Sequence, residues 1–171
     1  IDHARVEILK LLAEQPRIKV QVGADFSDTD AICDCDFLIT YTCDVIPSDD
    51  ETKRLVEYVN SGKKWFALHG TNSILRFMEP GDDGSPMVDC PEGNVPFMEV
   101  LGSQFMSHPP IHEYEVHVTE PDHPLVKDIP SFKVDDELYL CKFHGEHQTL
   151  LHTHWSDPVV NFIRDDWMKK S

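Results

Sequence analysis

The sequence lacks the marks of membrane-spanning, disulfide-rich and zinc-finger proteins. No apolar run approaches the roughly 20 residues that a membrane helix needs, and no basic segment leads into an apolar leader. The five cysteines are an odd number and include no C-x-x-C pair, so we expect neither a disulfide framework nor a zinc knuckle. These absences favour a reducing compartment, and we expect a cytoplasmic protein.

Positive charge is also scarce. The chain has 15 Lys and Arg against 31 Asp and Glu, which gives a formal net charge of −16. Such a surface repels phosphate backbones and anionic lipids, so we expect no nucleic-acid and no membrane partner. Solubility alone is the alternative explanation of this charge. The 171 residues, 40% of them hydrophobic, suffice for one globular domain.

The first half of the chain alternates between two periodic patterns. Helical patterns over 3–14 and 48–62 alternate with strand patterns over 17–23, 36–42 and 64–68. The second helix opens on a capping box and ends at a glycine. This alternation predicts a parallel sheet with helices on both faces.

The second half is less regular. Residues 78–95 are rich in Gly, Pro and acidic residues and have no period, which predicts a long loop. The remaining patterns are a short helix at 96–105 and strands at 113–119, 136–143 and 148–155.

The carboxyl ends of two predicted strands supply a candidate site. Cys43 and Asp44 follow one strand, and the sequence His69-Gly70-Thr71-Asn72 follows the other. Ligands of open parallel sheets bind outside these ends, and a glycine permits a sharp turn there. We therefore expect a thiol, a carboxylate, an imidazole, a hydroxyl and an amide at one edge, with a purely structural turn as the alternative.

Several of the ten histidines occur in pairs. His152 and His154 are two residues apart in a predicted strand, so they share a face and could bind one metal ion. A solvated strand face is the alternative, which the acidic composition favours. His144 and His147 do not have the spacing of a helical HExxH zinc site.

The clustered carboxylates of Asp135, Asp136 and Glu137 are candidates for a general acid or base, although a surface turn gives the same pattern. The apolar residues before Cys43 favour a structural thiol over a nucleophile.

Six stretches together resemble one protein family. They are "DFLITYTCDVIPS", "WFALHGTNS", "LGSQFMSHPPI", "EPDHPLV", "DDELYL" and "LLHTHW". In this order and spacing the chain resembles the ThuA-like family, named for trehalose utilisation, over nearly its whole length. The resemblance implies a three-layer α/β/α sandwich with a mostly parallel sheet, flavodoxin-like and similar to class I glutamine amidotransferases. Those enzymes carry a catalytic cysteine where this chain has His69, so we expect no cysteine-dependent amidotransfer.

The family motifs also imply site residues. The LHG motif falls on His69 and Gly70, the HPP motif on His108, and the DELY motif on Glu137. The resemblance thus implies His69, His108 and Glu137 as catalytic residues, while a loop-shaping role of the prolines after His108 is the alternative. The substrate-binding candidates are Asp44, Gly70, Thr71, Asn72, Gln104 and His144.

Two family features are missing from this sequence. Family members begin with a glycine-rich strand before the first helix and end with a strand carrying a "TLGH"-type turn. This sequence begins after the first and stops at "DDWMKKS". We therefore expect residues 1–171 to form a single domain without these two strands.

Two functions stay open. The first is an enzyme of carbohydrate metabolism, a hydrolase or isomerase acting on trehalose or a keto-sugar by His and Glu acid–base chemistry, or with a divalent metal such as zinc or manganese. The second is a non-catalytic small-molecule binding or regulatory module. Both imply a sugar-like ligand, and we further expect self-association into a homo-oligomer.

Overall fold

The computed structural model describes residues 2–157 and 159–163, which form a mixed α/β structure. They divide into two compact units, each considered by itself below. The first unit holds the described residues up to 74 together with 92–101, and the second holds 75–91 and those from 102 onward. Within this part of the chain, no helix is both long and apolar enough to cross a membrane. The single domain stays a prediction.

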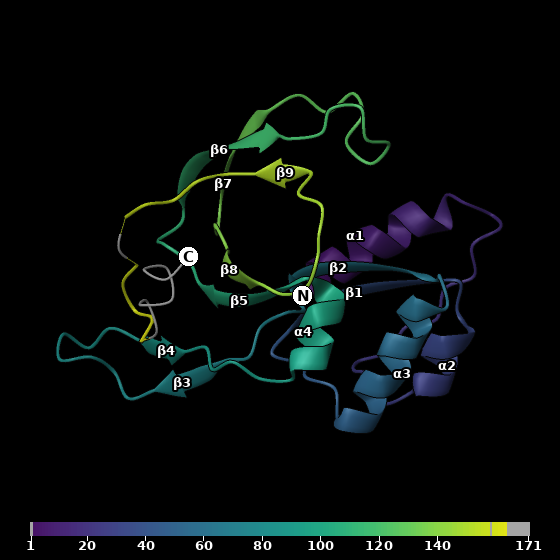
Figure 1. The fold of residues 1–171 in the computed structure, drawn as a ribbon, viewed down its shortest axis with the longest axis horizontal. Helices are drawn as coiled ribbons and strands as arrows, with labels where there is room; N and C mark the ends of the chain where they lie inside the picture. The colour runs from purple at the N-terminus through teal and green to yellow at the C-terminus, as the bar shows by residue number, and fades with distance from the viewer. Residues whose placement is uncertain (1, 158, 164–171) are drawn as a thin grey trace. The chain divides into compact units, whose positions relative to one another are not determined.

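The first unit is built around two parallel strands (Figure 1). Strands β1 and β2 pair in register from Phe37↔Lys64 to Cys43↔Gly70, so their carboxyl ends lie at the same edge. This confirms the parallel pairing that the alternating patterns predict. The elements in chain order are α1 (Asp2–Ala13), α2 (Thr29–Asp34), β1 (Phe37–Cys43), α3 (Asp49–Asn60), β2 (Lys64–Gly70) and α4 (Val95–Leu101).

Helix α3 connects the two parallel strands, and local sequence defines both of its ends. The Glu51 N–H donates to Ser48 Oγ at 3.4 Å, and the Ser48 N–H donates to Glu51 Oε2 at 2.7 Å. This reciprocal pair is the predicted capping box, which satisfies N–H groups that have no partner inside the helix. Past the last turn, Gly62 takes a φ of 90°, a conformation that favours glycine.

A buried cluster fixes the helices against one face of β1 and β2. Phe26, Leu55, Phe97 and Met98 form this cluster, and Trp65 of β2 packs against it. The ring of Phe26 meets the ring of Trp65 edge to face, with the two ring centroids 6.2 Å apart. Full burial of each such side chain stabilises the fold by roughly 1.5–3 kcal/mol. The cluster therefore holds β2, and with it the strand end that carries His69.

The second unit consists of antiparallel strands (Figure 1). Its described residues form three small sheets, of two, two and three strands. They are β3 (Arg76–Met78) with β4 (Met87–Asp89), β5 (Ser103–Ser107) with β8 (Leu140–Phe143), and β6 (His112–Val118) between β7 (Phe132–Asp136) and β9 (Leu151–His152). A mostly parallel sheet is thus observed only for β1 and β2 among the described strands.

The predicted strand at 17–23 is wrong. The segment is not a strand, and Ile18, Val20 and Val22 on its apolar face are all exposed. A strand requires a neighbour that accepts and donates its backbone hydrogen bonds, and alternation of side chains does not supply one.

Four further predictions for the second half need correction. The loop at 78–95 contains strand β4 and one residue of β3. The helix at 96–105 ends early, at Leu101, because Gly102 takes a φ of 78°, and strand β5 begins at the next residue. The strand at 136–143 is divided between β7 and β8, and only two residues of the one at 148–155 form strand β9.

Candidate functional site

Two neighbouring strands end in an uncommon backbone conformation. His69 has a φ of 53°, and Asp44, directly after β1, has a φ of 56°. A left-handed backbone costs an ordinary residue roughly 1–2 kcal/mol, so it persists only where the surroundings enforce it. Such positions concentrate at functional sites. The predicted edge at the carboxyl ends of β1 and β2 is therefore a strained edge.

The imidazole of His69 is both held in place and accessible. Its ring stacks on the ring of Tyr41, with centroids 4.9 Å apart and planes 11° apart. His69 is exposed, whereas the next residue, Gly70, is buried. An imidazole that is oriented and open to solvent is placed to act on a ligand as an acid or a base.

Gly70 is required for close packing of the two strand ends. A Cβ atom at Gly70 would lie 2.9 Å from Cys43 Sγ, closer than real contacts allow, and 3.1 Å from Cys43 Cα, tighter than most real contacts. The Cys43 thiol thus packs against the backbone of β2. This contact supports the interpretation of Cys43 as a structural thiol.

A network of hydroxyl groups supports the turn from inside. Thr71 Oγ1 lies 2.7 Å from Leu68 O, 3.1 Å from Thr40 Oγ1 and 3.2 Å from Thr42 Oγ1. The Trp65 N–H donates to Thr40 Oγ1 at 2.9 Å. One hydroxyl hydrogen serves one acceptor, and Leu68 O is the nearest acceptor of Thr71, so the Thr40 and Thr42 hydroxyls donate to Thr71. Thr71 is 1% exposed, and Asn72 is half-buried. Substrate binding by these two residues stays a prediction.

In the second unit, His108 has a defined tautomer. Its Nδ1 lies 2.8 Å from Pro109 O, and a carbonyl can only accept, so Nδ1 carries the hydrogen. The rings of Phe105 and Phe162 lie 6.2 and 5.1 Å from the ring of His108, centroid to centroid. The lone pair of neutral His108 is then on Nε2, as a general base requires.

The other predicted residues of the second unit differ in burial. Gln104 is fully buried, and its Nε2 donates to Pro91 O at 2.8 Å. Glu137 lies in the chain connection from β7 to β8 and is half-buried, and its N–H donates to Asp136 Oδ1 at 2.8 Å. His144 is half-buried, and its N–H donates to Gly102 O at 3.0 Å.

The predicted site residues fall into both units. Those of the first unit are Asp44, His69, Gly70, Thr71 and Asn72, and those of the second are Gln104, His108, Glu137 and His144. Within the first unit, the structure brings Asp44 and His69 to the same edge, as the sequence predicts. Convergence of His69, His108 and Glu137 on one ligand stays a prediction.

For the predicted divalent metal, the described residues provide no binding site with three or more side-chain ligands. Across residues 2–157 and 159–163, no three or more His, Cys, Asp and Glu side chains are grouped so that they could hold a metal ion. The carboxylates of Asp135 and Asp136 are exposed at the end of β7, which agrees with a surface turn.

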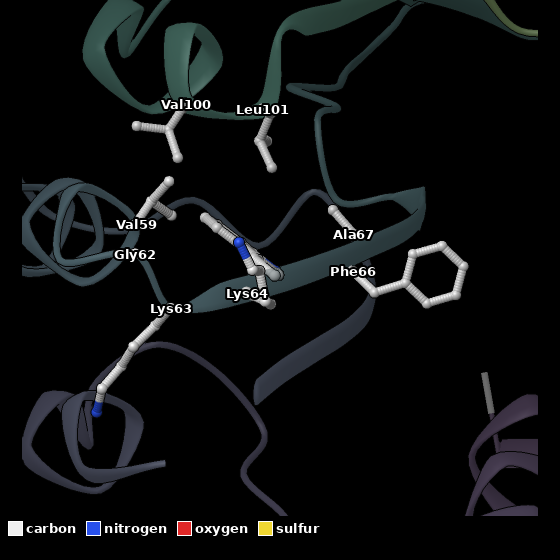
Figure 2. A pocket seen from close by; sticks show the side chains of 9 residues that line it. Val59, Gly62, Lys63, Lys64, Phe66, Ala67, Val100 and Leu101 are labelled. Atoms are coloured by element: carbon white, nitrogen blue, oxygen red, sulfur yellow. The ribbon is translucent and has the colours of Figure 1, made fainter. Parts of the chain in front are cut away.

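A hollow of about 490 Å³ in the first unit lies away from the predicted edge (Figure 2). Val59, Val100 and Leu101 line one side of it, while Phe66 points away from them. It follows the amino half of β2, whereas ligands of parallel sheets bind at the carboxyl ends. None of the predicted site residues lines it. Sequence patterns gave no signal for this hollow, because it depends on how α4 packs beside β2.

Comparison with known proteins gives one match. The family model ThuA, described as trehalose utilisation, matches residues 2–165. No curated protein and no solved structure matches the chain.

Proposed function

The chain belongs to the ThuA family, described as trehalose utilisation, and on that premise we propose that it converts a sugar by histidine and glutamate acid–base chemistry. The proposed substrate is trehalose or a keto-sugar, and the proposed reaction is hydrolysis or isomerisation. The observation that carries the proposal is the exposed, ring-stacked imidazole of His69 on a left-handed backbone at the strained edge.

For the fold, we propose that β1 and β2 belong to the three-layer α/β/α sandwich that the resemblance implies. Their parallel pairing, the connecting helix α3 and the cluster of helices on one face support this architecture. In class I glutamine amidotransferases, the catalytic cysteine lies at the end of the strand that corresponds to β2. In this chain the residue there is His69, and the nearest thiol, on Cys43, packs against Gly70, so cysteine-dependent amidotransfer is not proposed.

The proposed roles follow from the state of each side chain. His108 accepts a proton at Nε2, because Nδ1–H is held by Pro109 O. His69 transfers a proton from an exposed ring whose orientation Tyr41 maintains. Glu137, half-buried in the connection from β7 to β8, is the third proton-transfer group. Asp44, Asn72 and the remaining predicted residues bind substrate hydroxyl groups.

The charge of the chain supports a neutral ligand. A net charge of −16 disfavours phosphorylated sugars, nucleic acids and anionic lipids alike. Self-association also stays part of the proposal, supported by large apolar side chains such as Phe37 and Phe66 that are exposed on the strands.

The test is turnover of trehalose and of a keto-sugar, followed by proton NMR. We expect the parent protein to convert one of them. Asparagine tolerates a left-handed backbone, so His69→Asn should keep the fold and lose roughly 100-fold or more in kcat. His108→Gln and Glu137→Gln should lose similar factors. The exposed His3 of α1 supplies the control, because His3→Asn should keep full activity.

A second outcome would identify the other candidate function. If the parent binds a sugar in calorimetry without converting any, the protein is a non-catalytic binding module. If it neither binds nor converts these sugars, the proposed function is wrong.

A further inference from the structure

Two histidines face each other across strands β6 and β9. In the antiparallel register His117 lies directly opposite His152, and Figure 1 shows β9 alongside β6. Residues directly opposite in a sheet share a face, with Cβ atoms about 4.5–5.5 Å apart. The two imidazole rings have centroids 5.4 Å apart and planes inclined by 38°. Both residues are partly open to solvent, His117 with 48% of its side chain exposed.

The Nδ1 atom of each ring already has a polar neighbour. His152 Nδ1 lies 2.9 Å from the hydroxyl of Thr119, and His117 Nδ1 lies 3.9 Å from Glu115 Oε1. Histidines that bind metals commonly direct one ring nitrogen to the metal and donate the other N–H to a carboxylate or another oxygen. Thr119 occupies the position of such an outer oxygen, whereas the Glu115 carboxylate, at 3.9 Å, is a charged neighbour beyond hydrogen-bond distance. The Nε2 atoms are the nitrogens that this arrangement assigns to the metal.

We propose that His117 and His152 bind one late first-row divalent ion, Zn²⁺, Ni²⁺ or Cu²⁺, through their Nε2 atoms. Neutral imidazole suits these ions, whereas Mg²⁺, Ca²⁺ and Mn²⁺ prefer oxygen ligands. An ion about 2.1 Å from Nε2 lies about 3 Å from the ring centre. Rings with centroids 5.4 Å apart can therefore share one ion.

Charge near the pair favours a cation. The Glu115 carboxylate is next to His117. Lys133 lies opposite Glu115 on β7, and its ammonium group pairs with Glu113 at 2.9 Å, so the two carboxylates outnumber the one cation. The net charge of −16 adds to this attraction. No third side chain joins the pair as a ligand within the described part of the chain, so solvent completes the shell. Such a site is weaker than a four-ligand structural zinc site.

The consequence of binding is a link between two strands. Strand β9 is only two residues long, and an ion shared by His117 and His152 ties it to β6. An ion that binds the folded state and not the unfolded chain raises the melting temperature in proportion to the logarithm of its concentration. This site is independent of the proposed sugar chemistry.

The test is titration of the full chain with NiCl₂ and with ZnCl₂, followed by calorimetry and by the melting temperature. The parent should bind one ion per chain with a rise in melting temperature. His117→Gln and His152→Gln should each lose that ion and the rise. Glu115→Gln should weaken binding of the ion, because it removes the negative charge beside His117. The matched control is His154→Gln, two residues from His152 but outside β9, which should bind as the parent does.

A second measurement does not depend on the variants folding. In NMR spectra of the parent, paramagnetic Ni²⁺ should broaden the ring signals of His117 and His152 before those of the other histidines. Absence of saturable binding, equal loss in the His154→Gln variant, or earlier broadening of another histidine pair would each overturn the proposal.

Discussion

The ring of His69 lies flat against the ring of Tyr41, with centroids 4.9 Å apart, at the end of a strand where the His69 backbone is left-handed. Stacking of this kind contributes roughly 0.5–1.5 kcal/mol beyond the area buried, which offsets part of the backbone strain. The imidazole is therefore oriented before any ligand arrives. Two features beside it, and one at the other end of β2, lead to predictions about stability.

Replacement of Gly70 by alanine should destabilise the first unit. The new methyl group would come within 2.9 Å of Cys43 Sγ and 3.1 Å of Cys43 Cα, so a strand end must move. We expect a loss of about 1–3 kcal/mol in the free energy of unfolding, measured with urea. The control is Gly23→Ala, whose methyl group would meet nothing closer than 3.6 Å. Equal stability of the two variants would show that Gly70 is not a packing requirement.

Replacement of Thr71 by valine tests the hydroxyl network. The shape is kept, while Leu68 O loses a donor and the hydroxyls of Thr40 and Thr42 lose an acceptor. Because these groups are largely buried, the free energy of unfolding should fall by about 1–3 kcal/mol. The exposed Thr149 provides a control, since Thr149→Val should change stability by less than about 0.5 kcal/mol. A Thr71→Val variant as stable as the parent would show that the network is dispensable.

At alkaline pH, the stability of the first unit should also depend on the loss of the Tyr58 hydroxyl proton. Burial raises the pKa of Tyr58 above its ordinary value of 10.0, and the neighbouring Cys35 raises it further. The unfolded chain therefore releases this proton at lower pH than the folded chain does. The contribution to stability is complete below the unfolded pKa and is lost as pH rises through the folded one.

Chemical unfolding at several pH values measures this effect. Between about pH 9 and about pH 11 the free energy of unfolding of the parent should fall more steeply than that of Tyr58→Phe. At neutral pH the variant should already lose about 0.5–1.5 kcal/mol, because the Tyr58 hydroxyl donates to Lys64 O at 3.1 Å. Parallel pH curves for the two proteins would contradict a raised pKa.

Local signals in the sequence predicted the helices and strands whose ends are set by nearby residues. Helix α3 is a clear case, since Ser48, Glu51 and Gly62 define its limits within one short stretch. Strands β1 and β2 followed from apolar runs, and their pairing followed from the helix between them. The edge with Asp44 and His69 was predictable for the same reason.

Features that depend on distant partners were not predictable. Residues 17–23 alternate as a strand does, yet alternation does not say whether a neighbour exists, and the segment is exposed. The histidines show the same limit. Spacing along the chain paired His152 with His154, whereas the cross-strand register pairs it with His117, 35 positions away in sequence. Registers of this kind are set by packing of the whole unit and not by a local pattern.

NMR of the histidine rings during titration with trehalose and with a keto-sugar decides whether His69 and His108 serve one ligand. The ring signals of His69 and His108 should shift with the same apparent Kd, while that of His3 stays in place. Binding that leaves both His69 and His108 unchanged, or no binding of either sugar, would contradict the proposal.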